Sequence, residues 1–189
     1  MGFNELKFRI TGTAALVMHS AILSNPLSPL TKTFKTFSSK RKKTDEDFAE
    51  LARLEWYGGL YLDGGKPCIP SSNIEAMLVE AARKQRKGKS ALSGLFVEKN
   101  AMLDYAGPKT VDELWGDENF RLTVGARVQK NRIMRTRPIF KQWSAVVTIL
   151  YDTSQFSEHE VSNLMKTGGE IVGLCDWRPK FGRFVVEVL

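Results

Sequence analysis

The segment Ser144–Tyr151 constrains the fold most strongly. Its sequence, Ser-Ala-Val-Val-Thr-Ile-Leu-Tyr, is uncharged and rich in β-branched and aromatic residues, which is typical of a strand in the middle of a sheet. Two further strands are predicted near the ends of the chain. Leu6–Gly12 alternates apolar and polar residues, as a half-buried strand does, and Phe181–Val188 predicts a closing strand. The chain therefore has to build a sheet around Ser144–Tyr151.

Three helices are predicted from capping boxes, in which a hydroxyl residue precedes a carboxylate by three positions. The pairs are Thr44 with Asp47, Ser72 with Glu75, and Ser157 with Glu160. Apolar residues at helical spacing follow each pair, and Gly168-Gly169 is expected to stop the third helix. Residues 25–43 are rich in Pro, Ser and Thr and end in four cations, so they predict a mobile loop. Residues 104–118 are acidic and are also predicted to form a loop.

The order of these elements predicts the fold class. Strand, long insertion, helix, irregular β region, strand, helix and strand fit an α+β fold, a ferredoxin-like (RRM-like) βαββαβ sandwich. Hydrophobic residues make up 42% of the 189 residues, enough for the core of one domain. We expect a single domain over 1–189, with a basic loop–helix insertion over 24–66 and a basic β-hairpin over 121–143.

Several classes of protein are disfavoured. Cys68 and Cys175 are far apart and have no metal-ligand spacing near them, so we expect neither a disulfide framework nor a metal site. The N-terminus has no signal-peptide core, and the apolar stretch Ala14–Leu23 is too short to span a bilayer. We therefore expect a protein of the reducing cytoplasm that has no membrane partner. No motif predicts a cofactor.

The distribution of charge predicts a polyanion ligand. The formal net charge is +7, and two long stretches contain cations and no acid, 6–44 and 119–151. The cations that we expect to contact a strand are Lys40, Arg41, Lys42 and Lys43 in the first stretch, and Arg127, Lys130, Arg132, Arg135 and Arg137 in the second. Phe34 and Phe37 lie among the first group, where bases could stack. On a strand Lys130 and Arg132 would share a face, and Arg135 and Arg137 likewise, so the hairpin would have a cationic face and an apolar tip.

An enzymatic reading rests on one residue. His19 follows the first strand and could act as a general base on a ribose hydroxyl, whereas His159 is expected to be an exposed helix residue. No triad, phosphate-binding loop or paired acidic metal site accompanies His19. We therefore expect no catalytic residues and no enzyme, and keep a metal-independent endoribonuclease as the alternative.

Three segments resemble the RAMP superfamily of CRISPR-associated proteins. Lys66–Ile74 (Lys-Pro-Cys-Ile-Pro-Ser-Ser-Asn-Ile) is similar to the Ile-Pro-Gly-Ser-Ser entry to that superfamily's first helix. Gly168–Gly173, continued to Arg178 and then Phe181–Phe184, resembles its glycine-rich loop. The first strand, Phe8–Thr13, fits as well. The resemblance covers about a quarter of the chain and is greatest to the backbone subunit that polymerises along the guide RNA.

The resemblance implies a ferredoxin-like palm, a thumb formed by the Lys130–Arg137 segment, and a strand lying along Asn25–Lys43. It also implies hydroxyl or backbone contacts from Ser71, Ser72 and Gly169. The expected partners are single-stranded RNA, copies of the same chain in a filament, and other subunits of an effector complex. Ser71 stands where the pattern has glycine. This departure leaves open a compact relative from a phage or mobile element, binding single-stranded DNA or serving in assembly.

Overall fold

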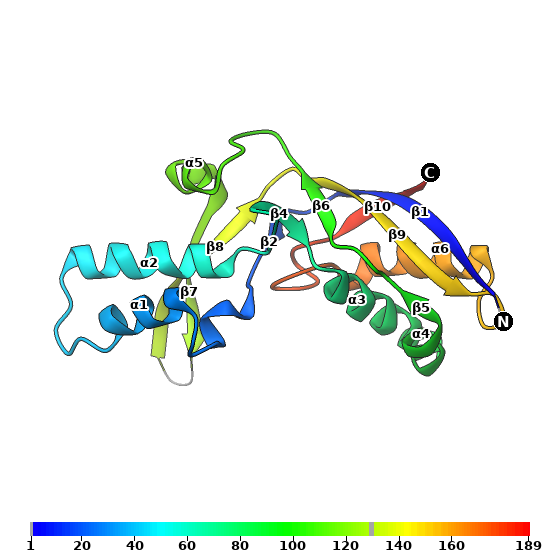
Figure 1. Ribbon diagram of the computed structural model, residues 1–189, viewed down its shortest axis with the longest axis horizontal. Helices are drawn as coiled ribbons and strands as arrows, with labels where there is room; N and C mark the ends of the chain where they lie inside the picture. The colour runs from blue at the N-terminus through cyan, green and yellow to red at the C-terminus, as the bar shows by residue number, and fades with distance from the viewer. Residues whose placement is uncertain (1, 129–130) are drawn as a thin grey trace. The chain divides into compact units, whose positions relative to one another are not determined.

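The computed structural model describes residues 2–128 and 131–189, and it divides into two compact units. The first unit contains the N-terminal residues to Leu16, Leu62–Ala106 and Lys141–Leu189. The second contains Val17–Tyr61 and Gly107–Phe140. Figure 1 traces the elements of both along the chain. Among the described residues, no helix has the length and apolar character needed to cross a membrane.

The first unit is built on an antiparallel sheet whose centre is β9 (Ser144–Asp152). The strand order is β10 (Phe184–Val188), β1 (Phe3–Gly12), β9, β6 (Ala101–Asp104), β4 (Lys66–Ile69) and β3 (Leu62–Asp63), with β5 (Leu95–Phe96) also paired to β9. Phe8 of β1 is opposite Val147 of β9 on one side and Val188 of β10 on the other. The predictions of a first, a central and a closing strand are thereby confirmed.

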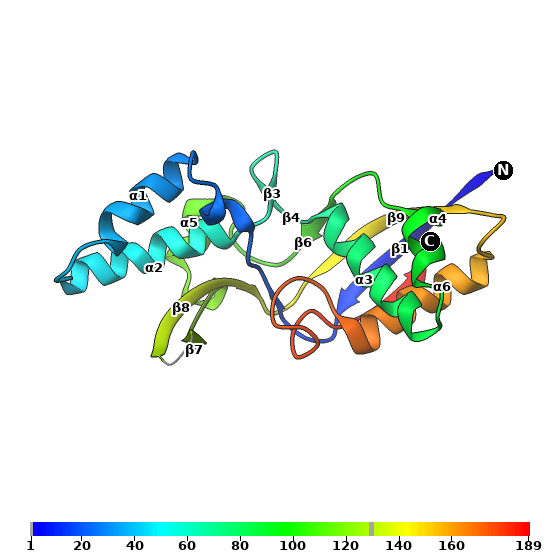
Figure 2. The same ribbon diagram turned by 90° about the horizontal axis from the view of Figure 1, so that it is seen from below.

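Three helices of the first unit lie on one face of this sheet, as Figures 1 and 2 show. They are α3 (Ser71–Lys84), α4 (Gly88–Gly94) and α6 (Glu158–Thr167). Phe8 and Ile10 of β1 are fully buried, as are Met77 of α3 and Met165 of α6. Burial alternates along β1, so the other face of the strand carries its polar side chains. The succession β1–α3–β6–β9–α6–β10 is the βαββαβ order of a ferredoxin-like fold.

The helix starts show which capping predictions were right. Ser157 and Glu160 form the predicted capping box of α6. The box predicted for Ser72 and Glu75 is wrong, because α3 begins one residue earlier, at Ser71, and its N-cap Pro70 offers no side-chain acceptor. The side chain of Asn100 accepts the Ser71 amide instead, at 3.0 Å.

Helices make up much of the second unit. They are the 3-10 turns η1 (Ala21–Ser24) and η2 (Glu118–Phe120) and the helices α1 (Pro29–Ser38), α2 (Asp45–Gly59) and α5 (Val111–Gly116). Thr44 and Asp47 cap α2 as predicted. Two loop predictions are wrong, since α1 occupies most of 25–43 and α5 lies within 104–118. Pro29 at the first position of α1 fits a helix start, and Thr110 with Glu113 caps α5.

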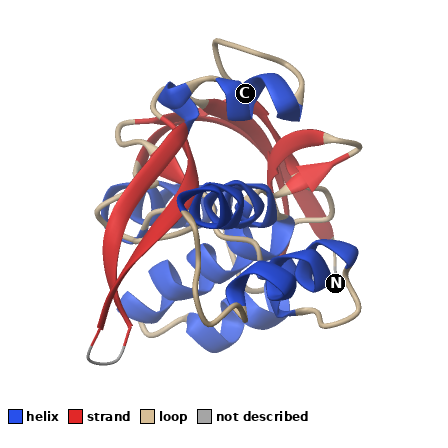
Figure 3. Ribbon diagram, turned by 90° about the vertical axis from the view of Figure 1, so that its left-hand side faces the viewer, coloured by secondary structure: helices blue, strands red, loops and turns tan. Residues whose placement is uncertain are grey.

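A three-stranded sheet completes the second unit, in the order β2 (Leu16–Val17), β8 (Asn131–Phe140) and β7 (Arg121–Val128). β7 and β8 are antiparallel, with Thr123 opposite Thr136, and Figure 3 shows them as one long ribbon. We call this pair the β7–β8 ribbon. Its base packs on α2 through Trp56, whose indole nitrogen donates to the Phe120 carbonyl at 2.8 Å.

Candidate nucleic-acid interface

The predicted contact residues are divided between the two units. Ser71, Ser72 and Gly169 belong to the first unit, and the predicted cations belong to the second. The side chain of Arg127 and the whole of Lys130 lie outside the described residues.

The α1–α2 turn, residues 39–44, carries the four consecutive cations. The Lys40 ammonium donates to Asp47 Oδ1 at 2.5 Å and lies 5.0 Å from the centre of the Phe37 ring. Lys43 Nζ donates to the Lys40 carbonyl at 2.7 Å. The hydrogen bonds of these two lysines therefore stabilise the conformation of the turn. The donated hydrogen bond from Lys40, followed by the Thr44 amide, lowers the pKa of Asp47 below its ordinary value.

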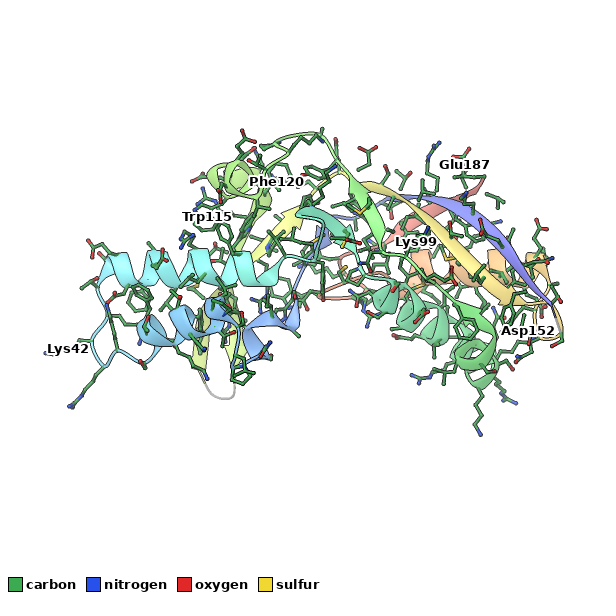
Figure 4. The ribbon with its side chains drawn as sticks, viewed as in Figure 1. Lys42, Lys99, Trp115, Phe120, Asp152 and Glu187 are labelled. Atoms are coloured by element: carbon green, nitrogen blue, oxygen red, sulfur yellow. The ribbon has the colours of Figure 1, made fainter. Side chains whose placement is uncertain are left out.

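Arg41 and Lys42 are the outward cations of this turn. Both are exposed, and Figure 4 shows Lys42 reaching away from the ribbon. On the preceding helix Lys32 and Lys35 are exposed as well, and Phe34 is half-buried. This surface of the α1–α2 turn therefore presents positive charge to solvent, which is the arrangement that a phosphate backbone requires.

The predicted role of Arg135 and Arg137 as phosphate ligands needs correction. Both guanidinium groups donate to the same oxygen, Glu55 Oε1, at 2.9 and 3.0 Å. The other oxygen of Glu55 accepts the Thr136 amide at 2.9 Å. Arg137 is 7% exposed and Glu55 is 7% exposed. Arg137 is therefore an internal cation that holds β8 against α2, and Arg135 is half-buried in the same cluster.

Arg132 remains on the surface of the β7–β8 ribbon. It is exposed, and so are the neighbouring Ile133 and Met134, the latter 63% exposed. Arg132, Ile133 and Met134 thus present one cation and two apolar side chains to solvent on consecutive positions of β8. The turn that joins β7 to β8 lies outside the described residues, so the predicted apolar tip stays a prediction.

The predicted contact residues of the first unit differ in their exposure to solvent. Ser72 is exposed and Ser71 is half-buried at the start of α3. Gly169 is buried, and a Cβ there would lie 2.4 Å from the Phe184 carbonyl oxygen. Glycine at position 169 is therefore required for close packing of the segment Gly168–Val172 against β10. A backbone contact from Gly169 to a ligand is not supported, because the residue has no surface.

A basic and aromatic segment lies beside α3, and its cations are not among the predicted contacts. Residues 177–183 (Trp-Arg-Pro-Lys-Phe-Gly-Arg) combine three cations with two aromatic rings, and this composition is the sequence pattern by which the segment could have been recognised. Lys180 lies 5.5 Å from the centre of the Phe181 ring, and Lys180 and Arg183 are exposed. Gly182, at φ +73°, allows the turn that follows. Burial raises the pKa of the adjacent Cys175 to about 12, so this thiol is protonated at neutral pH.

His19 lies in the second unit and is exposed. Its backbone carbonyl accepts the Tyr61 hydroxyl at 2.8 Å. Within residues 2–128 and 131–189 no three His, Cys, Asp or Glu side chains come together as metal ligands would.

The first unit therefore defines an α+β protein with a ferredoxin-like fold. No protein-family model matches the sequence, and no curated protein matches it. Solved structures do match. One is a chain of the cryo-EM structure of the Type III-B Cmr-beta bound to cognate target RNA, with a TM-score of 0.50 and 12% identity. The match covers 99% of this chain and 61% of that chain, so this chain spans about three-fifths of its neighbour's length. Identity this low supports the fold alone.

Proposed function

We propose that this protein binds single-stranded RNA through the phosphate backbone, without cleaving it, as a repeating subunit of a CRISPR-type ribonucleoprotein filament. The observation that carries the proposal is the exposed cationic surface of the α1–α2 turn, in the same unit as a ribbon with exposed apolar residues. Cations that hold phosphates and apolar side chains that contact bases are the two components of non-specific single-strand binding.

The likeness to a chain of an RNA-bound Cmr complex supports RNA as the ligand. The exposed residues Ser72, Lys180 and Arg183 extend the proposed contacts to the first unit. Hydroxyl groups, lysines and arginines are all common donors to phosphate oxygens. In the filament, each subunit would contact one segment of the guide strand and other copies of the chain on either side.

The first test is whether the protein carries nucleic acid. Protein purified at moderate salt should show an ultraviolet absorbance ratio raised by bound nucleic acid, and RNase rather than DNase should remove it. Removal by DNase alone would replace RNA with single-stranded DNA as the ligand. Protein that carries no nucleic acid and binds no single strand at low salt would overturn the proposal.

The second test measures which cations meet the strand. Each phosphate contact on a single strand contributes roughly −0.7 to the slope of log affinity against log salt concentration. The double variant Arg41→Ala/Lys42→Ala should therefore flatten the slope by about 1.4. Its matched control is Lys84→Ala/Lys166→Ala, which removes two exposed helix cations of the first unit and should leave the slope unchanged. An unchanged slope in the first variant would remove the α1–α2 turn from the interface.

The absence of catalysis is tested with labelled RNA. We expect the wild-type protein to leave the RNA intact in the presence of a chelator. Cleavage that is lost on His19→Ala would establish the endoribonuclease alternative.

A further inference from the structure

The second unit contains a hollow that the proposed phosphate contacts do not use. Its volume is about 400 Å³, which is near the lower end of the roughly 300–1,000 Å³ of small-molecule pockets. The residues that line it come from α2, α5, η2 and the β7–β8 ribbon. They are Ala49, Ala52, Trp115, Glu118, Arg121, Thr123 and Thr136. The two alanines of α2 leave the hollow open, because larger side chains at these positions would enter it.

One wall of the hollow is a cation stacked on an aromatic ring. The Arg121 guanidinium carbon lies 4.7 Å from the centre of the Trp115 ring, within the range of a favourable cation–π contact. Trp115, a residue of α5 that Figure 4 labels, packs on Trp56 with ring centres 5.5 Å apart. The contact with Trp56 holds the Trp115 indole in place. A planar, weakly hydrated guanidinium held on a fixed ring is a surface on which a further flat group can stack.

The local charge favours a neutral ligand. The Arg121 Nη2 atom lies 3.4 Å from Glu118 Oε1, so the charges of this pair largely cancel, and the exposed Glu118 carboxylate would repel a phosphate. Arg121 Nε is buried and has no hydrogen-bond partner among the described residues. The hydroxyl groups of Thr123 and Thr136 lie 3.1 Å apart, and hydroxyls both donate and accept. The hollow thus offers a flat platform and polar edges.

We propose that this hollow binds one unpaired nucleobase of the strand, stacked on the Arg121–Trp115 pair and hydrogen-bonded at its edge by the exposed Thr123, whose hydroxyl is held by the buried Thr136. The inference rests on the proposed function, since the phosphates on either side of the base are held by the exposed cations. It adds a stacking site for a base to the exposed cations and the exposed apolar residues that the proposed function already assigns to the strand. A base in such a slot is recognised by its flat face, so every base can be bound.

The test fills the hollow without removing a contact. Ala49→Leu places a larger side chain at an exposed, helix-compatible position of α2. Ala21→Leu is the matched control, because Ala21 is also exposed and belongs to the same unit but does not line the hollow. Arg121→Lys is a second variant that keeps the charge and loses the planar group. The affinity of each is measured for a short single-stranded RNA and for the same ribose-phosphate strand without bases, after melting curves establish that the variants are folded.

The expected result depends on the strand. Stacking of one base contributes enough that Ala49→Leu and Arg121→Lys should weaken RNA binding by about 5- to 150-fold. Both variants should bind the abasic strand as the wild type does, and Ala21→Leu should bind both strands unchanged. Equal losses for both strands, or no loss, would overturn the nucleobase slot while leaving RNA binding intact. A wild-type protein that binds neither strand would overturn the proposed function and the slot together.

Discussion

Substitution of Glu55 by alanine should destabilise the protein severely. The Glu55 carboxylate is the common partner of Arg135, Arg137 and the Thr136 amide, and its ion pair with Arg137 is between two side chains that are each 9% exposed. Removal of one partner of a buried ion pair costs about 3–5 kcal/mol, because the remaining charge stays buried. For a chain of this size each kcal/mol lowers Tm by about 2–4 °C. We therefore expect Tm to fall by about 6–20 °C.

The matched control is Glu50→Ala on the same helix. Glu50 also pairs with an arginine, Arg53, at 2.7 Å, but both side chains are partly solvated, at 28% and 39% exposed. Such pairs contribute about 0–1 kcal/mol, so Tm should fall by at most about 4 °C. The contrast between the two variants compares a buried carboxylate that binds β8 with a partly solvated one that binds a residue of its own helix.

A double substitution tests whether the stranded charge is responsible. Glu55→Met/Arg137→Met replaces the buried pair by apolar side chains of similar length, a change that is often neutral. Its Tm should lie well above that of Glu55→Ala. The assay is thermal melting, with hydrogen exchange at the Thr136 amide to report on the ribbon. If Glu55→Ala melts within about 4 °C of the wild type, or if the double variant is as unstable as the single one, the electrostatic explanation is wrong.

Three further predictions concern other parts of the structure. The hydrogen bond from Lys87 lowers the pKa of Glu160 from 4.5 to about 2. The stabilisation by the ionised Glu160 carboxylate is therefore complete above about pH 4.5 and is lost as the pH falls toward 2. The difference in Tm between the wild type and Glu160→Gln should shrink across that pH window, and a constant difference would contradict the prediction. Cys68 is buried, and burial raises its pKa to about 11, so a thiol reagent at about pH 8 should label it only after unfolding; rapid labelling of Cys68 in the folded protein would refute this. Gly169→Ala should lower stability by about 1–3 kcal/mol through overpacking rather than abolish RNA binding, and urea denaturation would measure the loss.

Short-range features could be predicted from the sequence, because the interacting residues are neighbours. The capping boxes of α2 and α6 need only residues three positions apart, and the buried alternation of β1 needs only its own pattern. The start of α3 could not be predicted in this way. The residue that accepts the Ser71 amide is Asn100, 29 positions later in the chain. A pattern read along the chain contains no information about which loop returns to a helix end.

The same limit explains the correction at the β7–β8 ribbon. An acid-free stretch of sequence seemed to leave Arg135 and Arg137 free for phosphates. Their carboxylate partner, Glu55, lies about 80 positions earlier, so local charge counting could not find it. Counting charges within a segment therefore overestimates the number of cations that are available to a ligand whenever another element carries acids to the same place.

The carboxylates of helix α2 determine which cations of the second unit are available to a polyanion. Its first turn binds Lys40 through Asp47, and its last third binds the ribbon through Glu55. These carboxylates are eight residues apart, about 12 Å along a helix, so they fix two separate parts of the unit. Arg41 and Lys42, which α2 does not bind, are exposed on the turn. A carboxylate that neutralises an internal arginine therefore has a second effect, because it reduces the positive charge left for a polyanion. On this reasoning the binding surface is determined as much by the acids of α2 as by the total of 28 lysines and arginines.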